Sequence, residues 1–169
     1  AYRQVEFLRR TLESIRGQDF HDYELIVTDD SPDDAVERLV GEFPLNGRLR
    51  YVRNPSPLGS PENWNECVRL ARGELVKIMH HDDFFANASA LGRFVAMMDE
   101  QPEAMFGFSA TLVEDVNTGQ LRVHAPTDRQ LQLLRLKPHV LFAGNCIGSP
   151  SATVYRRSLG LQYDRAMKW

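Results

Sequence analysis

His80, His81, Asp82 and Asp83 form a polar cluster directly after an apolar stretch, residues 75–79. A short apolar stretch that follows a glycine is typical of a buried strand in an α/β sheet, and such sheets bind ligands at the carboxyl ends of their strands. Carboxylate oxygens are the ligands that hard divalent cations prefer. The cluster therefore predicts a site for a metal ion and a nucleotide.

Two alternatives compete with this interpretation of the cluster. Asp82 and Asp83 could belong to a solvated loop in which carboxylates cap a helix. His80 and His81 could hold zinc, but no cysteine and no suitably spaced histidine lies nearby in the sequence, which disfavours zinc.

A second acidic pair, Asp29 and Asp30, follows another apolar stretch, residues 23–28. A carboxylate at such a strand end accepts hydrogen bonds from the imide N–H of uracil or from ribose hydroxyls, so this pair is a candidate nucleoside contact. The alternative is helix capping, because Ser31 is placed to cap the next helix and Pro32 suits its first position. One aspartate could serve each purpose.

The elements that position these residues follow from apolar periodicity and turn signals. The pattern predicts helices over residues 5–15, 32–43, 64–71 and 91–98, strands over residues 23–28, 49–52, 74–79 and 152–155, and an antiparallel hairpin of residues 104–114 and 121–124. Strands and helices alternate over the first hundred residues, and a mixed segment follows. The fold class is therefore α/β.

Two segments keep alternative interpretations. Trp64 lies on the apolar face of its helix, which favours core packing over stacking on a sugar. Residues 144–151 could line an acceptor pocket through backbone amides and small side chains, or could form a plain loop before the strand at residues 152–155.

Composition limits the classes of protein to consider. With 169 residues, 43% of them hydrophobic, the chain is long enough for one globular domain with a core. A net charge of −3 gives no broad basic surface and disfavours nucleic-acid binding. Cys67 and Cys146 fit reduced thiols, although one disulfide remains an alternative. No apolar run approaches the ~18 residues of a membrane span.

The alternation of elements begins with a helix, whereas a βαβ series normally begins with a strand against which that helix packs. We therefore expect a strand ahead of Ala1. The last residues, 163–169, carry no turn or capping signal. The pattern predicts a fragment that is incomplete at both ends.

The order of several short motifs resembles that of family 2 glycosyltransferases of the GT-A fold. The matching residues are Tyr2, Arg3, Phe7, Leu8, Thr11, Leu12, Ser14 and Ile15, then residues 24–31, then Asn63, Trp64 and Asn65, then residues 71–74, and finally Asp82 and Asp83. The resemblance is strong over residues 1–100 and looser afterwards. It implies a mixed, Rossmann-like sheet flanked by helices and one domain over residues 1–169, with a nucleotide-sugar-binding half, 1–100, and part of an acceptor half, 101–169.

The resemblance also implies an activity. Family members transfer a sugar from a nucleotide-diphosphate donor to an acceptor hydroxyl, with inversion in the best-studied branch. A divalent metal, Mn²⁺ or Mg²⁺, neutralises the diphosphate as it leaves. The implied metal ligands are Asp82 and Asp83, and the implied donor-binding residues are Asp29, Asp30, Asn65 and His80. In this chain His80 replaces the first aspartate of the family's Asp-X-Asp signature, and Trp64 replaces an arginine that precedes the asparagine.

The catalytic base is the residue that the sequence does not supply. An inverting transfer needs a carboxylate to take the proton of the acceptor hydroxyl. The family carries it in an acidic motif after an element that Tyr163 and Asp164 resemble, so the base is expected after Trp169. Asp164 is a weaker candidate. We expect the fragment alone to bind a nucleotide sugar weakly and to turn over poorly.

The resemblance favours a UDP-sugar as donor and a saccharide or lipid-linked acceptor, in a cytoplasmic protein that associates peripherally with the inner face of the membrane. Three other functions remain open, of which a receiver-like phosphoacceptor lacks a convincing set of strand-end aspartate and later lysine. A nucleotidyltransferase that makes nucleotide sugars also uses an α/β sheet with acidic metal ligands, although its usual Gly-rich, basic loop is not found. A non-catalytic nucleotide-binding or partner-binding module would keep Asp29 and Asp30 without needing a metal.

Overall fold

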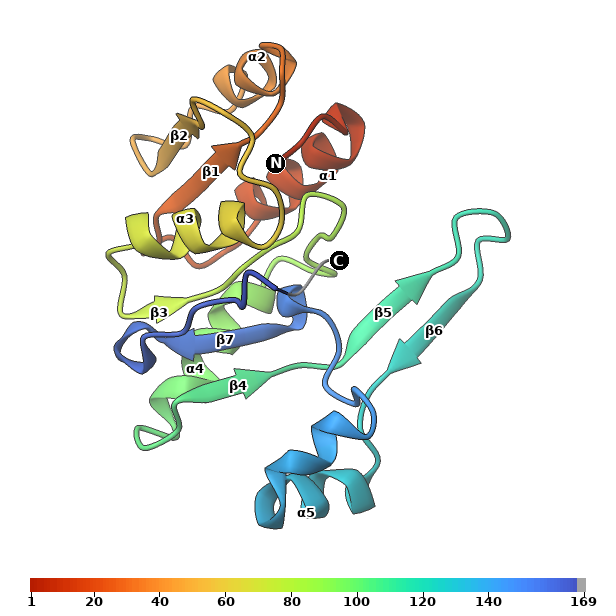
Figure 1. The fold of residues 1–169 in the computed structure, drawn as a ribbon. Helices are drawn as coiled ribbons and strands as arrows, with labels where there is room; N and C mark the ends of the chain where they lie inside the picture. Colours follow the sequence, from red (N-terminus) through yellow and green to blue (C-terminus); the bar gives the residue numbers. More distant parts are fainter. Residues whose placement is uncertain (167–169) are drawn as a thin grey trace.

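The computed structural model describes residues 1–166 (Figure 1). The helices are α1 (Val5–Arg16), α2 (Ala35–Gly41), α3 (Glu62–Leu70), α4 (Ala90–Asp99) and α5 (Asp128–Leu136), with short 3-10 helices η1 (Pro138–Phe142), η2 (Pro150–Ala152) and η3 (Arg157–Leu159). The strands are β1 (Leu25–Asp29), β2 (Leu49–Arg53), β3 (Leu75–Val76), β4 (Phe106–Phe108), β5 (Thr111–Glu114), β6 (Leu121–His124) and β7 (Thr153–Arg156). The alternation of strands and helices over the first hundred residues confirms the α/β class.

The strands form a mixed set of pairings. β1 and β2 are parallel, with Leu25 opposite Leu49 and Asp29 opposite Arg53. β7 lies between β3 and β4 and is antiparallel to both. β5 and β6 form an antiparallel pair that extends away from the other strands, as does the nearby α5 (Figure 1). The parallel strands and the β3-β7-β4 sheet thus carry the two acidic strand ends.

Two apolar clusters hold these sheets. The first is built from α1, β1 and α2, and its buried members are Leu8, Leu12, Val27, Val36, Leu39, Val40 and Phe43. The second joins α4 to β7 through Phe94, Met98 and Val154. α1 buries its predicted apolar stripe and ends at Arg16, with Gly17 as its C-cap, as the sequence predicts. None of the helices within residues 1–166 combines the length and the apolar character that crossing a bilayer requires.

The structure corrects three predicted elements. The strand predicted at residues 74–79 is limited to β3, because only Leu75 and Val76 pair with β7, opposite Arg156 and Tyr155. The segment 104–114 does not form one arm of a hairpin. Its first part, β4, pairs with β7, and only β5 pairs with β6. The predicted arm is thus split into two strands, because β4 pairs with β7, which comes much later in the chain.

The third correction concerns the start of α2. Ser31 does not cap it, because α2 begins at Ala35 and its N-cap residue, Asp34, makes no side-chain capping hydrogen bond. The Ser31 amide donates to Asp29 Oδ1 at 2.9 Å, and the Ser31 hydroxyl accepts from the Arg3 amide at 2.7 Å. These bonds keep the chain after β1 in an irregular turn, so the helix starts later than Pro32.

A cavity of about 1230 Å³ lies between β1 and β3. Leu12, Val27, Ile78 and Phe94 are among its apolar lining residues. Beside β1, the Ala1 amino group donates to the Thr28 carbonyl, and the Ala1 carbonyl accepts from the Asp30 amide at 3.0 Å, which is the pairing pattern of parallel strands. The strand predicted ahead of Ala1 lies outside residues 1–169 and stays a prediction.

Candidate metal centre and its surroundings

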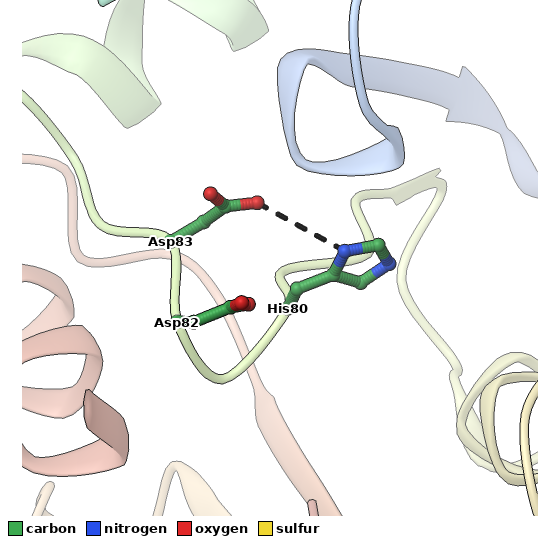
Figure 2. A group of neighbouring side chains, drawn as sticks. All are labelled: His80, Asp82 and Asp83. Atoms are coloured by element: carbon green, nitrogen blue, oxygen red, sulfur yellow. Dashed lines mark ion pairs between the residues drawn. The ribbon is translucent and has the colours of Figure 1, made fainter. Parts of the chain in front are cut away.

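His80, Asp82 and Asp83 converge on one loop after β3 (Figure 2). Ligand atoms from the three side chains, one from each, lie within 4.8 Å of one another, and His80 Nδ1 lies 3.9 Å from Asp83 Oδ2. Asp82 is exposed, and His80 and Asp83 are half-buried. An imidazole nitrogen with two carboxylates is a donor set that suits a divalent cation. The structure therefore brings His80 to the two residues that the sequence predicts as metal ligands.

Thr11 on α1 fixes the backbone of this loop. Its hydroxyl lies 2.8 Å from the His81 carbonyl oxygen and 2.7 Å from that of Asp83. Thr11 is 3% exposed, so this hydroxyl is shielded from water and its hydrogen bonds are not exchanged for water. The loop therefore turns its backbone toward α1 and leaves the carboxylates of Asp82 and Asp83 on the other side.

The same face of α1 continues this attachment further along the loop. Ser14 Oγ accepts from the Phe85 amide at 3.1 Å. Gln18 Nε2 donates to the Asn87 carbonyl at 2.9 Å, and Gln18 Oε1 accepts from the Leu91 amide at 2.8 Å. Thr11 and Ser14 lie one turn apart on α1, and Gln18 follows directly after its C-cap, Gly17. This polar stripe fastens the chain from the metal centre to the start of α4, and the sequence reading missed it.

The segment before β7 packs against the other side of the centre. Ser151 Oγ accepts from the His80 amide at 2.9 Å, and Ser149 Oγ donates to Asp83 Oδ2 at 3.4 Å. Lys77 Nζ donates to the Ser151 carbonyl and, at 3.4 Å, to that of Thr153. Burial lowers the pKa of Lys77 to about 8. Ser149 and Ser151 thus border the metal centre, and an acceptor pocket lined by residues 144–151 stays a prediction.

His80 lies against one aromatic ring. The Trp64 ring stacks on the imidazole with centroids 4.7 Å apart, and Tyr163 meets Trp64 edge-on at 5.2 Å. Burial lowers the pKa of His80, and nearby Asp83 and Asp82 oppose that effect only in part. The imidazole is therefore neutral at pH 7, the form that binds metals. Its Nε2 atom is buried without a hydrogen-bond partner among residues 1–166.

Asn65 is engaged with the chain's own backbone. Its Nδ2 donates to the Tyr163 carbonyl at 2.9 Å, and its Oδ1 accepts from the Tyr163 amide at 2.8 Å. This pair of bonds places Tyr163 against Trp64. The neighbouring Asp164 is exposed, and its Oδ1 accepts from the Ala166 amide at 2.9 Å. The base predicted after Trp169 lies outside the described residues, 1–166, and stays a prediction.

Asp29 has no exposed surface. Its Oδ1 accepts from the Ser31 amide at 2.9 Å, and its Oδ2 accepts from the Tyr51 hydroxyl at 2.8 Å. Burial and the Asp29 carboxylate both raise the pKa of Tyr51, so this hydroxyl stays protonated and donates. Both carboxylate oxygens of Asp29 are thus committed to the turn after β1 and to β2.

Asp30 is 5% exposed and lines the cavity. Its Oδ1 accepts from Asn54 Nδ2 at 2.7 Å and from the Leu58 amide at 3.1 Å, and its Oδ2 accepts from the Gly59 amide at 2.8 Å. This carboxylate therefore shapes the loop between β2 and α3. His80 and Asp82 line the same cavity, so the two acidic strand ends face a common space.

Comparisons with known proteins identify the family of this chain. The sequence profile of Glycosyl transferase family 2 matches residues 1–160. An uncharacterised protein of Mycobacterium tuberculosis is 27% identical over 170 residues, which cover 95% of this chain and 52% of the relative. A GalNAc(5)-diNAcBac-PP-undecaprenol beta-1,3-glucosyltransferase of Campylobacter jejuni is 29% identical over 123 residues, which cover 72% of this chain and 33% of that enzyme. The chain thus spans at most about half the length of these two relatives.

Solved structures show the same fold. S. aureus TarS superposes with a TM-score of 0.68 at 22% identity, over 94% of this chain and 27% of TarS. The mannosyltransferase PcManGT of Pyrobaculum calidifontis, solved with GDP-Man and Mn²⁺, gives a TM-score of 0.57 at 23% identity, over 81% of this chain and 44% of that protein. The chain belongs to glycosyl transferase family 2, and its fold is that of the GT-A glycosyltransferases.

Proposed function

We propose that this chain carries the donor-binding part of a glycosyltransferase that moves a sugar from a nucleotide-diphosphate donor to an acceptor hydroxyl with inversion. The observation that carries the proposal is the convergence of His80, Asp82 and Asp83, because His80 and Asp82 line the cavity that Asp30 also lines. Family membership supplies the reaction class. The donor class is supported by TarS structures with UDP and UDP-GlcNAc and by PcManGT with GDP-Man. We favour a UDP-sugar.

Asp82 and Asp83 are the proposed metal ligands, and Mn²⁺ or Mg²⁺ is the proposed ion. When bound, the ion neutralises negative charge on the leaving diphosphate. The protein's own contribution is positional. Thr11 and Ser151 hold the backbone on either side of the carboxylates, so both groups face the same space before any ligand arrives.

The donor-binding residues predicted from the sequence have divided roles in this proposal. Asp30 and His80 line the cavity and are the proposed contacts with the nucleoside and the diphosphate. Asp29 and Asn65 support the site indirectly in this proposal. Asp29 fixes the turn that presents Asp30, and Asn65 fixes the segment that carries Tyr163. The apolar interior of the cavity between β1 and β3 does not suit a charged diphosphate, so only its polar end enters the proposal.

The acceptor side of the reaction rests on the family alone. We place the catalytic base after Trp169 and keep exposed Asp164 as the weaker candidate, since Tyr163 beside it lies against Trp64 of the proposed site. A saccharide or lipid-linked acceptor, handled at the inner face of a membrane, completes the proposal.

Calorimetric titration with UDP, with and without Mn²⁺, tests the proposal. We expect binding that depends on Mn²⁺ in the wild-type chain and loses that dependence in Asp82→Asn. Asp128→Asn, an exposed aspartate in the first turn of α5, is the matched control and should behave as wild type. UDP binding that ignores both Mn²⁺ and Asp82→Asn would indicate a non-catalytic nucleotide-binding module instead. Absence of UDP binding under both conditions contradicts the proposal.

A further inference from the structure

The segment formed by α5 and η1, residues 128–142, exposes large apolar side chains. α5 carries four leucines, yet none of its residues is buried. Leu136 is 79% exposed and Phe142 is 96% exposed, and neither apolar cluster of the fold includes a residue of this segment. The segment also extends away from the sheets (Figure 1). Apolar side chains that are exposed together on a protruding element mark a surface for a partner.

The segment has a defined shape. Thr127 and Gln130 form a capping box that fixes the start of α5, and η1 contacts α5. Its half-buried apolar side chains are Leu134, Val140 and Leu141. Its exposed apolar side chains are Leu131, Leu133, Leu136 and Phe142. The exposed set is therefore held by a helix that is already formed.

The same segment is cationic within an acidic chain. It holds Arg129, Arg135 and Lys137 against one carboxylate, Asp128, which gives a formal net charge of +2. The chain total of −3 leaves −5 for the other residues. All three cations are exposed, and within residues 1–166 none of them forms an ion pair. Their charge is therefore available to an anionic partner.

We propose that residues 128–142 dock this protein on the surface of an anionic lipid bilayer. Exposed leucine and phenylalanine beside arginine and lysine are typical of helices that lie in a membrane interface. Leu136 and Phe142 enter the boundary between headgroups and acyl chains. The flexible stems of Arg135 and Lys137 let their charges reach the lipid phosphates. This docking rests on the proposed function, which places a lipid-linked acceptor at a membrane.

Charge favours a bilayer over a second copy of the chain. A two-fold interface through this segment would bring two surfaces of net charge +2 together and would bury unpaired cations. An anionic leaflet instead attracts the segment and repels the acidic remainder of the chain. The two effects together orient the protein with α5 and η1 toward the lipid.

The docking surface is connected to the candidate metal centre through the chain. After η1 the chain runs to Ser149 and Ser151, which bond to Asp83 and to the His80 amide. Docking through η1 therefore brings the segment that borders the centre toward the lipid surface. The headgroup of a lipid-linked acceptor lies at that surface.

Flotation of the chain with vesicles of phosphatidylglycerol and phosphatidylcholine, and with vesicles of phosphatidylcholine alone, tests the docking without nucleotide or metal. We expect flotation with the anionic vesicles only, weakened by added salt. Phe142→Ser should weaken binding by at least about tenfold, and Arg135→Gln by about fivefold. Val116→Ser, at a side chain 75% exposed between β5 and β6, and Arg93→Gln, at an exposed position on α4, are the matched controls and should float as wild type.

Three results would overturn the docking: no flotation with anionic vesicles, equal flotation with both kinds of vesicle, or flotation that Phe142→Ser and Arg135→Gln leave unchanged in chains whose folding circular dichroism verifies. Self-association in sedimentation velocity that Phe142→Ser abolishes, without flotation, would assign the surface to a second copy. The proposed function can fail separately, because flotation without Mn²⁺-dependent UDP binding would support the docking and contradict the transfer reaction.

Discussion

The two acidic strand ends have the same sequence character and different surroundings. Asp29 and Asp30 follow β1, are almost fully buried, and accept five hydrogen bonds from the protein itself. Asp82 and Asp83 follow β3 and are exposed and half-buried, with the Ser149 hydroxyl and His80 facing Asp83. A carboxylate that accepts chiefly from the protein's own donors shapes the chain, and Asp30, whose Oδ2 accepts one such bond, keeps an acceptor site for the proposed nucleoside contact. A carboxylate that keeps its lone pairs in reach of solvent is available to a ligand.

The difference in role between the two acidic pairs predicts that Asp29 is needed for folding and that Asp82 is not. Asp29→Ala leaves the Tyr51 hydroxyl and the Ser31 amide without their acceptor, and we expect it to lower the free energy of unfolding by about 2–4 kcal/mol. Asp82→Ala, at an exposed position, should change it by less than about 0.5 kcal/mol. Urea unfolding of both variants gives the comparison. Equal effects from the two substitutions would contradict the assignment of different roles.

Addition of Mn²⁺ should make the stability of the chain depend on Asp82 and Asp83, which contribute little to it without metal. At a Mn²⁺ concentration about 100 times its dissociation constant, binding should stabilise the wild-type chain by about 2.7 kcal/mol. Asp82→Asn and Asp83→Asn should lose most of this gain while folding normally without metal, and chelation should return the wild-type chain to its metal-free stability. Thermal unfolding with and without Mn²⁺ measures this stabilisation in each variant. The account fails here if the Asp83→Asn chain is stabilised as much as wild type.

Thr11 links the stability of α1 to the metal centre. Thr11→Val removes the hydroxyl between the carbonyls of His81 and Asp83, and we expect a loss of about 1–2 kcal/mol in unfolding free energy together with weaker Mn²⁺ binding. Thr11→Ser keeps the hydroxyl and should retain Mn²⁺ affinity. Chemical denaturation and Mn²⁺ titration of the pair test this, and identical Mn²⁺ affinity in the valine and serine variants would show that the loop does not depend on Thr11.

The smallest expected effect concerns Asn65. Asn65→Ala removes two hydrogen bonds to the Tyr163 backbone, and we expect a cost of about 1 kcal/mol in unfolding free energy. Loss of the edge-on contact should also change the emission of Trp64, measured in a Trp169→Phe background that leaves Trp64 as the sole tryptophan. Mn²⁺ affinity should stay within a factor of a few, because Asn65 touches neither proposed metal ligand. A large loss of Mn²⁺ binding would instead place Asn65 in the metal centre itself.

Local sequence signals predicted the parts of the fold that depend on neighbours in the chain. The apolar period of α1, its end at Gly17 and the strand before Asp29 are all present. The sequence reading missed α5, although Thr127 and Gln130 form a capping box that the sequence displays. The interrupted hairpin was not predictable in the same way, because the pairing of β4 with β7 joins residues far apart in the sequence.

The candidate site likewise combines residues that local sequence signals predict with contacts that they do not predict. Asp82 and Asp83 could be singled out from the sequence because they are contiguous and follow an apolar stretch. The stacking of Trp64 on His80, the bonds from Asn65 to Tyr163 and the attachment of the loop to Thr11 depend on how distant segments pack. Polar residues at positions 11 and 14 of α1 and at position 18 just after it were the available signal, since polar side chains on a buried face need partners.

The central claim is that His80, Asp82 and Asp83 form a metal-dependent site for a nucleotide diphosphate. A crystal structure of the chain with UDP and Mn²⁺, with anomalous diffraction data to locate manganese, tests it most directly. The account predicts a manganese peak bounded by these three side chains, with the diphosphate on the open side of the ion and the uridine toward Asp30. A manganese peak elsewhere, or bound UDP with no manganese beside Asp82 and Asp83, would contradict it.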